Sequence, residues 1–182
     1  LLFETSSDGA FIVDRTTGRV VSANVRVAEM LAIDTDAILG RSLADLGFDI
    51  DISEMRPGGR YAPVVMDSRY AYVSGQIPRV GDHIVVTGAV GGDVSLDQAR
   101  QAARICAMRM LTLLQNTLGS LDRVLQIMRI NVYVQSAPGF TQQSEVADAA
   151  SDLLVQVLED AGAHTRTSVG VFQLPKNAAV EI

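Results

Sequence analysis

The sequence predicts an α+β fold, and three observations support this prediction. Short runs rich in β-branched and aromatic residues occupy residues 70–90, which is typical of a hairpin. Apolar residues recur at helical spacing in two segments, 95–119 and 144–159. Apolar and polar residues alternate over 124–134, which indicates a half-buried strand between the two helices. Together with a strand-like C-terminal run, this predicts the order ββαβαββ, with both helices on one face of a mixed sheet.

The first predicted hairpin pairs residues 70–78 with residues 82–90 across a turn at Gly81-Asp82. Ser95 stands three residues before Gln98, a capping-box spacing that predicts the start of the first helix. Gly119 is expected to end it. The inward face is predicted to hold Ala99, Ala102, Ala103, Cys106, Met110, Leu113, Leu114 and Thr117.

In the strand at 124–134, the inward residues are expected to be Met128, Ile130, Val132 and Val134. The second helix is predicted to bury Val146, Ala149, Leu153, Leu154 and Val157. A closing hairpin is predicted to pair 166–173 with 179–182 around the LPKN turn. The other sheet face would carry Arg129 and Tyr133, and we expect an oligomer contact to cover it.

The first 45 residues form a separate pattern. Residues 9–14 and 19–24 predict a hairpin with its turn at 16–18, and Asn24 stands where a helix N-cap is expected. A short helix is expected near 36–39, ended by Gly40. Residues 46–59 contain Pro57, Gly58 and Gly59 and read as a linker before a domain at 60–182.

The composition argues against several classes of protein, including nucleic-acid-binding, metal-binding and membrane proteins. The net charge is −6, and residues 60–182 hold ten basic against eleven acidic side chains, so no basic face for nucleic acid is expected. Arg100, Arg104, Arg109 and Arg123 are interpreted as a solvated face. The single cysteine, Cys106, excludes an internal disulfide and is interpreted as a core residue. The two histidines have no recognisable metal spacing, and no apolar run is long enough to cross a bilayer, so we expect a cytoplasmic protein without a metal.

Residues 1–45 carry a resemblance of their own. The stretch "ETSSDGAFIVDRTTGRVVSANVRVAEMLAIDTDAILGRSLADL" resembles the front half of a PAS sensory domain, truncated before the strands that would close its sheet. A two-stranded fragment cannot bury both faces of its hairpin. The segment is therefore expected to pack on the second domain, to pair with another copy, or to be a remnant.

The second domain carries a more specific resemblance to a known family. The stretches "YAPVVMDSRYAYVSGQIP", "LGSLDRVLQIMRINVYVQSAPGF" and "HTRTSVGVFQLPKNAAVEI" resemble the YjgF/RidA family, the reactive-intermediate deaminases, also known as L-PSP endoribonucleases. The resemblance covers residues 46–182 and is closer to the longer YjgF-like branch. It implies a chorismate-mutase-like fold, a homotrimer and a site in each subunit cleft.

The resemblance also implies roles for individual residues. Arg166 corresponds to the arginine that grips the substrate carboxylate, and Glu181 to the glutamate that handles water. The other implied cleft residues are Tyr61, Ser74, Gly75, Ser168 and Asp148, where Asp148 stands in place of a common asparagine. Structural alternatives stay open: Tyr61 as a packing aromatic, Ser74 as a backbone contact, and Arg166 as a strand-edge arginine paired with a surface carboxylate.

The implied reaction is hydrolysis of a 2-imino acid to a 2-oxo acid and ammonia, and it needs no metal or organic cofactor. In the predicted closing hairpin, Glu181 and Arg166 would be about six residues, or roughly 20 Å, apart. They would then meet only between neighbouring protomers. The alternatives are a non-catalytic metabolite-binding or assembly module with a PAS-derived regulatory segment, and a ribonuclease.

Overall fold

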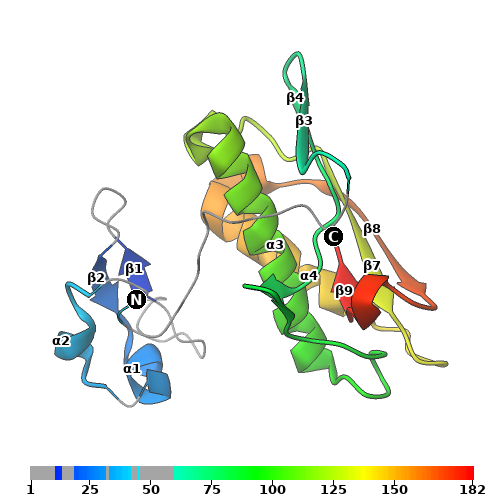
Figure 1. The fold of residues 1–182 in the computed structure, drawn as a ribbon, viewed down its shortest axis with the longest axis horizontal. Helices are drawn as coiled ribbons and strands as arrows, with labels where there is room; N and C mark the ends of the chain where they lie inside the picture. The colour runs from blue at the N-terminus through cyan, green and yellow to red at the C-terminus, as the bar shows by residue number, and fades with distance from the viewer. Residues whose placement is uncertain (1–10, 14–18, 32, 42–44, 46–59) are drawn as a thin grey trace. The chain divides into compact units, whose positions relative to one another are not determined.

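The computed structural model describes residues 11–13, 19–31, 33–41, 45 and 60–182. The chain divides into two compact units, residues 1–51 and 52–182. Figure 1 shows the described elements of each. The predicted turn at 16–18 and the predicted linker at 46–59 lie outside the described residues.

The N-terminal unit has the predicted order of two strands and two helices. Strands β1 (Phe11–Val13) and β2 (Val20–Ala23) pair antiparallel, followed by α1 (Val25–Leu31) and α2 (Thr35–Ile38). The side chain of Asn24 accepts a hydrogen bond from the Val27 N–H at 3.0 Å, which confirms the predicted N-cap. Among the described residues of this unit, the buried apolar side chains form one small cluster, which comprises Val20, Ala23, Val27, Ala28 and Ile38.

The C-terminal unit begins with two separate hairpins. Strands β3 (Val64–Asp67) and β4 (Tyr70–Val73) pair antiparallel, whereas β5 (Arg79–Val80) and β6 (His83–Ile84) form a two-residue ladder around Gly81-Asp82. The predicted pairing of 70–78 with 82–90 is therefore wrong, although the predicted turn is present. The nearer partner for β4 is β3, since a two-residue loop joins them, and Pro78 has no N–H to give to a ladder.

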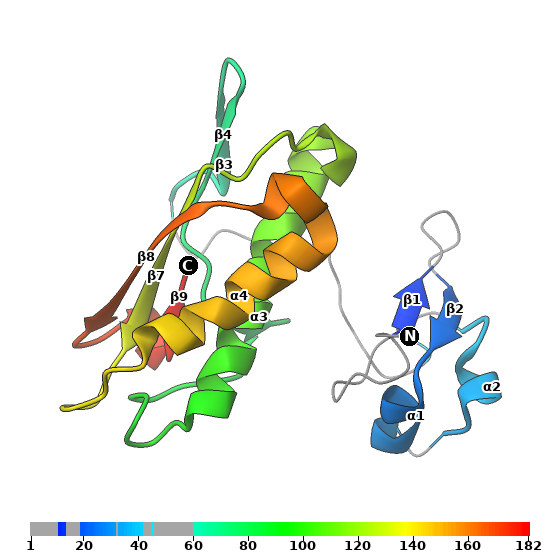
Figure 2. The same ribbon diagram turned by 180° about the vertical axis from the view of Figure 1, so that it is seen from behind.

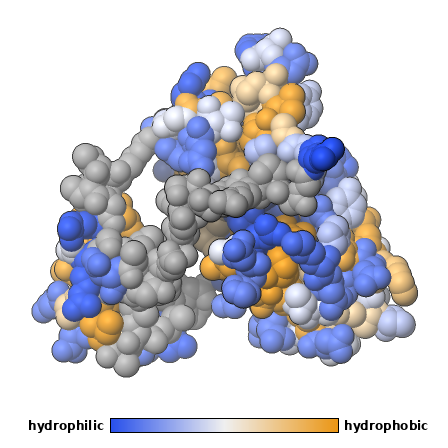
Figure 3. Space-filling view, in the orientation of Figure 1, coloured by the Kyte–Doolittle hydropathy of each residue, from blue (hydrophilic) through white to orange (hydrophobic). Residues whose placement is uncertain are grey.

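The β3–β4 hairpin projects from the rest of the unit in both ribbon views (Figures 1 and 2). In the space-filling view, its tip is polar and hydrophobic residues follow below the tip (Figure 3). Four of its large side chains are about half exposed: Val65, Met66, Tyr70 and Tyr72. The hairpin thus presents apolar surface to its surroundings.

Helix α3 (Leu96–Leu118) follows the predicted limits. Ser95 Oγ accepts from the Gln98 N–H at 3.2 Å and the Gln98 side chain accepts from the Ser95 N–H at 2.9 Å, which confirms the capping box. Gly119 ends the helix with a left-handed φ of 79°, a conformation that favours glycine. A short turn of 3₁₀ helix, η3 (Leu121–Arg123), leads on to the central sheet.

Strand β7 (Arg129–Gln135) is the central strand of the main sheet. Its neighbours are β8 (Thr165–Val171), which runs parallel to it, and β9 (Val180–Glu181), which runs antiparallel. Between β7 and β8 lie α4 (Gln143–Leu158) and the 3₁₀ turn η4 (Glu159–Gly162), and both long helices cover one sheet face (Figure 2).

The predicted closing hairpin is wrong because β8 and β9 lie on opposite sides of β7. The 3₁₀ turn η5 (Pro175–Asn177) carries left-handed φ values of 56° at Lys176 and 58° at Asn177, and this redirects the chain. The side chain of Gln135 holds the segment that connects β8 to β9 across β7. It donates to Asn177 Oδ1 at 2.6 Å and accepts from the Leu174 N–H at 2.9 Å.

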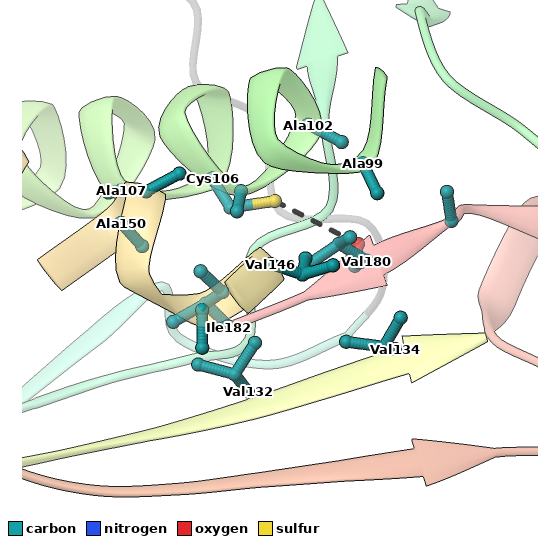
Figure 4. Close-up of a cluster of buried hydrophobic side chains, with 14 of the residues drawn as sticks. Ala99, Ala102, Cys106, Ala107, Val132, Val134, Val146, Ala150, Val180 and Ile182 are labelled. Atoms are coloured by element: carbon teal, nitrogen blue, oxygen red, sulfur yellow. Dashed lines mark hydrogen bonds between the residues drawn. The ribbon is translucent and has the colours of Figure 1, made fainter. Parts of the chain in front are cut away.

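The core lies between the two helices and the sheet, as Figure 4 shows for Cys106, Val132, Val146 and Val180. Three predicted core residues are wrong. Thr117 is exposed near the end of α3. Met128 is 62% exposed because β7 begins one residue later, and Val157 is 44% exposed near the end of α4. The predicted inward residues Ile130, Val132, Val134, Val146, Ala149 and Leu154 are buried.

Removing the capping box should weaken α3 measurably. Ser95→Ala is expected to lower the free energy of unfolding by about 1 kcal/mol, because it leaves N–H groups of the first turn without an acceptor. Urea denaturation followed by circular dichroism measures this loss. Thr112→Ala is the control, since that hydroxyl bonds only to a carbonyl of its own helix. Equal losses in the two variants would contradict the assigned cap.

Candidate functional site

Arg166 lies on β8 and faces α4. It is paired with Ile130, a buried residue of β7, and therefore shares the helix-covered sheet face. Its NH1 forms an ion pair with Asp148 Oδ1 at 2.8 Å and donates to Ser151 Oγ at 2.9 Å. Its NH2 lies 3.5 Å from the carbonyl of Ser144. We name Ser144, Asp148, Ser151, Arg166 and Ser168 the Arg166 cluster.

The helical spacing along α4 and the alternation along β8 explain why these side chains lie together. Residues 144, 148 and 151 are spaced by four and three along α4 and so share one helix face. Arg166 and Ser168 are two apart on β8 and share one strand face. The Ser168 and Ser144 hydroxyls lie 3.3 Å apart. The cluster therefore places the predicted residues Asp148, Arg166 and Ser168 together in one chain.

The ion pair leaves Arg166 partly available. The side chain of Asp148 is 51% exposed and that of Arg166 is 22% exposed. A guanidinium has five N–H groups, and the contacts to Asp148, Ser151 and Ser144 use three of them. The Nε–H and one NH2 hydrogen remain for another acceptor. An exposed ion pair of this kind is worth only about 0.2–1 kcal/mol, so a competing carboxylate could displace Asp148.

Glu181 lies in a second group, the Glu181 cluster, which comprises Tyr61, Ser74, Gly75 and Glu181. Glu181 is paired with Tyr133 of β7 and is partly buried, and this burial raises the pKa of its carboxyl group. Gly75 lies directly against Glu181 Oε1, because a Cβ built at Gly75 would overlap that oxygen. The absence of a side chain at Gly75 thus makes room for the carboxylate.

Ser74 fastens the backbone beside this carboxylate. Its Oγ donates to the carbonyl of Ala62 at 2.7 Å, and its N–H donates to the carbonyl of Pro63 at 2.9 Å. Tyr61 precedes this anchored segment and is 52% exposed. The hydroxyl of Ser74 therefore has a backbone contact, the structural alternative considered for it, and Tyr61 has free surface for a ligand.

The solvated role assigned to Arg109 is wrong. Arg109 is partly buried, and its Nε donates to Gln76 Oε1 at 3.2 Å while its NH1 donates to the carbonyl of Arg79 at 3.2 Å. Burial, followed by the nearby charge of Arg79, lowers the pKa of Arg109. The backbone of Gln76 exchanges hydrogen bonds with Ile182, so Arg109 braces the segment next to Gly75 and Glu181.

The two clusters do not meet within one chain. Arg166 is opposite residue 130 of β7, and Glu181 is opposite residue 133 on the other side of that strand. Three residues along and two strand spacings across separate their Cα atoms by about 14 Å. Their partners Ile130 and Tyr133 also point to opposite sheet faces, since residues three apart on a strand alternate. Within one chain, Arg166 and Glu181 therefore lie apart and on opposite faces of the sheet.

Other candidate chemistry is limited. Burial raises the pKa of the Cys106 thiol well above its ordinary value, and its Sγ lies 3.8 Å from the carbonyl of Val180 in the core (Figure 4). Cys106 is thus a core residue, as predicted. Within the described ranges, His, Cys, Asp and Glu form no group of three that could hold a metal ion. In the same part of the chain, no helix is long and apolar enough to span a membrane.

Sequence reasoning missed Ser144, Ser151 and His164. His164 Nε2 lies 3.0 Å from Ser151 Oγ, and its Nδ1 lies 2.6 Å from the carbonyl of Gly162. The polar residues 144, 148 and 151, which recur at helical spacing, were a visible signal. A second signal was the spacing of His164 two residues before Arg166, which favours the same face of an extended chain.

The chain matches a known protein family over most of its length. Residues 46–181 match a family described as YjgF/chorismate-mutase-like and as a candidate endoribonuclease. The match begins at residue 46, so residues 1–45 lie outside it and their PAS resemblance stays a prediction.

Individual proteins agree with this match. Protein TCP17 of Trypanosoma cruzi is 42% identical over 127 residues, which cover 69% of this chain and 79% of that protein. The crystal structure of Atu1372 from Agrobacterium tumefaciens, a protein of unknown function, is similar with a TM-score of 0.68 and 37% identity, covering 76% of this chain and 85% of that one. A candidate endoribonuclease from Shewanella oneidensis has the same fold, with a TM-score of 0.69, 24% identity and coverage of 76% and 91%.

The raised pKa of Glu181 predicts a pH-dependent stability. Because the folded state holds the proton more tightly than the unfolded state, the stability that Glu181 contributes is present at acid pH and is lost as pH rises through its folded pKa. Glu181→Gln should therefore gain thermal stability relative to wild type between about pH 4 and pH 7. Thermal melts across this range measure the difference. Glu145→Gln is the control, and the same pH trend in both variants would contradict the prediction.

Proposed function

Because the chain belongs to the YjgF/chorismate-mutase-like family, we propose that it hydrolyses small 2-imino and enamine acids to 2-oxo acids and ammonia. The proposed sites lie between copies of the chain in a homotrimer. The Arg166 cluster of one protomer and the Glu181 cluster of its neighbour would form each site. The proposed substrate is a small carboxylate metabolite, with no nucleic acid, membrane or cofactor taking part.

The observation that carries this proposal is the setting of Arg166. Its guanidinium is anchored through NH1 and keeps two N–H groups, on a partly buried surface. A planar guanidinium binds a carboxylate through paired charge-assisted hydrogen bonds, which a lysine cannot reproduce. Asp148 already shows that a carboxylate oxygen fits at 2.8 Å from NH1. A substrate carboxylate would take the same role.

Glu181 is suited to handle the water. Its partly buried carboxyl has a raised pKa, which brings it nearer to the pH at which a general base is most effective. The lack of a side chain at Gly75 makes room for Oε1 itself. The carboxylate would hold a water molecule against the imine carbon and accept its proton as the C–O bond forms.

The remaining steps need little from the protein. Water adds to the C=N carbon and gives a carbinolamine, with one proton passing to Glu181. That proton then goes to the nitrogen and the C–N bond breaks. Ammonia leaves as the C=O bond forms, and the hydroxyl proton of the carbinolamine passes to Glu181. An iminium carbon is already electrophilic, so positioning of substrate and water can supply most of the acceleration.

The Arg166–Asp148 ion pair also favours a second candidate, a non-catalytic metabolite-binding module. A permanent intrachain partner for Arg166 is the strand-edge alternative considered from the sequence. In that case the cleft would hold a carboxylate weakly and no reaction would follow. A ribonuclease is less favoured, because residues 60–182 hold ten basic against eleven acidic side chains and offer no excess positive charge for RNA.

The proposed activity can be tested by trapping the substrate. An amino-acid oxidase generates 2-imino acids, and semicarbazide captures what has not been hydrolysed. Wild type should lower the rate of semicarbazone formation. Arg166→Ala should lose about 10- to 100-fold in kcat/KM, because it removes hydrogen bonds to a charged group. No effect of wild type over buffer would favour the binding module, and full activity of a stable monomer would contradict the shared site.

Asp148 should compete with substrate for Arg166. Asp148→Asn is expected to lower KM by up to about fivefold with kcat little changed, because the displaced ion pair is exposed and weak. Steady-state kinetics in the same assay measure both constants. Asp152→Asn removes the same charge from an exposed position on α4 and is the matched control. A higher KM in Asp148→Asn would instead make Asp148 a substrate ligand.

A further inference from the structure

A series of three polar contacts leads from Gly162 to Arg166 and is not part of the proposed chemistry. His164 Nδ1 lies 2.6 Å from the carbonyl oxygen of Gly162, and His164 Nε2 lies 3.0 Å from Ser151 Oγ. Arg166 NH1 donates to the same Ser151 oxygen at 2.9 Å. The contacts thus connect the η4 turn, helix α4 and strand β8 in an unbroken series that ends at the guanidinium.

Only one assignment of hydrogens satisfies every contact with a neutral histidine. A carbonyl oxygen only accepts, so Nδ1 of His164 must carry the proton and donate to Gly162. A guanidinium only donates, so Ser151 Oγ must accept from Arg166. The Ser151 hydrogen is then free to donate to Nε2, which is the acceptor in this tautomer. Each hydrogen bond that a group in the series accepts strengthens the one that it donates.

The far end of the series is fixed by packing. A Cβ built at Gly162 would lie 2.6 Å from the carbonyl carbon of Leu154 and 2.8 Å from Cα of Val155, both backbone atoms of α4. These atoms cannot move aside as the end of a flexible side chain could. The Gly162 carbonyl is therefore held against α4, and it offers His164 a stationary acceptor.

We propose that His164 and Ser151 are positioning residues, which hold Arg166 in the orientation in which it binds the substrate carboxylate. This inference rests on the proposed function. Asp148 is exposed and must give way when a substrate carboxylate binds, whereas the partly buried Ser151 and His164 stay in place. They fix one end of the Arg166 side chain, which would otherwise lose considerable rotamer entropy when the substrate binds. The arrangement is preorganised before the substrate arrives.

The kinetic test compares deletions with conservative replacements in the semicarbazide assay. Ser151→Ala and His164→Ala should each raise KM about tenfold, with kcat within about twofold of wild type. Ser151→Thr keeps the hydroxyl, and His164→Gln can place an acceptor near Ser151, so both should recover most of the loss. Thr112→Ala deletes a helix hydroxyl away from Arg166 and should leave KM unchanged. An unchanged KM in both alanine variants, or a fall confined to kcat, overturns the inference.

Nuclear magnetic resonance of the ¹⁵N-labelled protein gives a readout that needs no activity. At pH 8.5, His164 should show the Nδ1–H tautomer, and the Arg166 guanidinium hydrogens should exchange slowly in wild type but faster in Ser151→Ala. The Nε2–H tautomer, or equal exchange in the two proteins, overturns the inference. If wild type fails to hydrolyse imines, the proposed function fails while this measurement still decides whether the positioning series exists.

Discussion

The position of β7 between a parallel and an antiparallel neighbour is the constraint on which the rest of the C-terminal unit depends. The parallel partner β8 needs a crossover, and α4 supplies it and covers the helix-side face. The antiparallel partner β9 brings Val180 under α3 and leaves Glu181 on the opposite face. Because one strand sets the register of both neighbours, it also sets where Arg166 and Glu181 stand. The chorismate-mutase-like fold thereby separates the two candidate residues within each chain.

The contact between Arg166 and Asp148 has two opposing consequences. It satisfies a partly buried cation that would otherwise be costly, and it occupies the group that the proposed reaction needs. The magnitudes decide between these effects. An ion pair with a half-exposed carboxylate is weak, and a bound substrate that excludes water would gain more from the same guanidinium. The resting ion pair is thus compatible with a working site and sets a modest barrier to its use.

Local patterns of the sequence predicted local structure well. The Ser95–Gln98 capping box, the Gly119 end of α3 and the alternation in β7 were all visible, because each depends on residues only a few positions apart. The pairing of the last strand was not visible in this way. A hairpin between β8 and β9 was the simplest local choice, but the left-handed Lys176 and Asn177 and the distant side chain of Gln135 carry the chain across β7.

The same distinction applies to the candidate site. Arg166, Asp148 and Ser168 could be singled out by resemblance, yet the contact between Asp148 and Arg166 depends on how α4 packs on β8, which no short segment encodes. Arg109 looked like one of several scattered surface charges until the fold placed it against Gln76.

The separation of Arg166 and Glu181 within one chain affects how their charges would be desolvated in the proposed site. If a site forms only where two copies meet, burial of Arg166 and Glu181 increases at that contact, and the electrostatic interaction of each with a bound substrate strengthens as water leaves. Neither chain then has to hold a fully desolvated charge before the copies meet, which would be destabilising for the isolated fold. The proposed assembly would thus supply the low-polarity environment that a single chain, with Asp148 half exposed beside Arg166, does not provide.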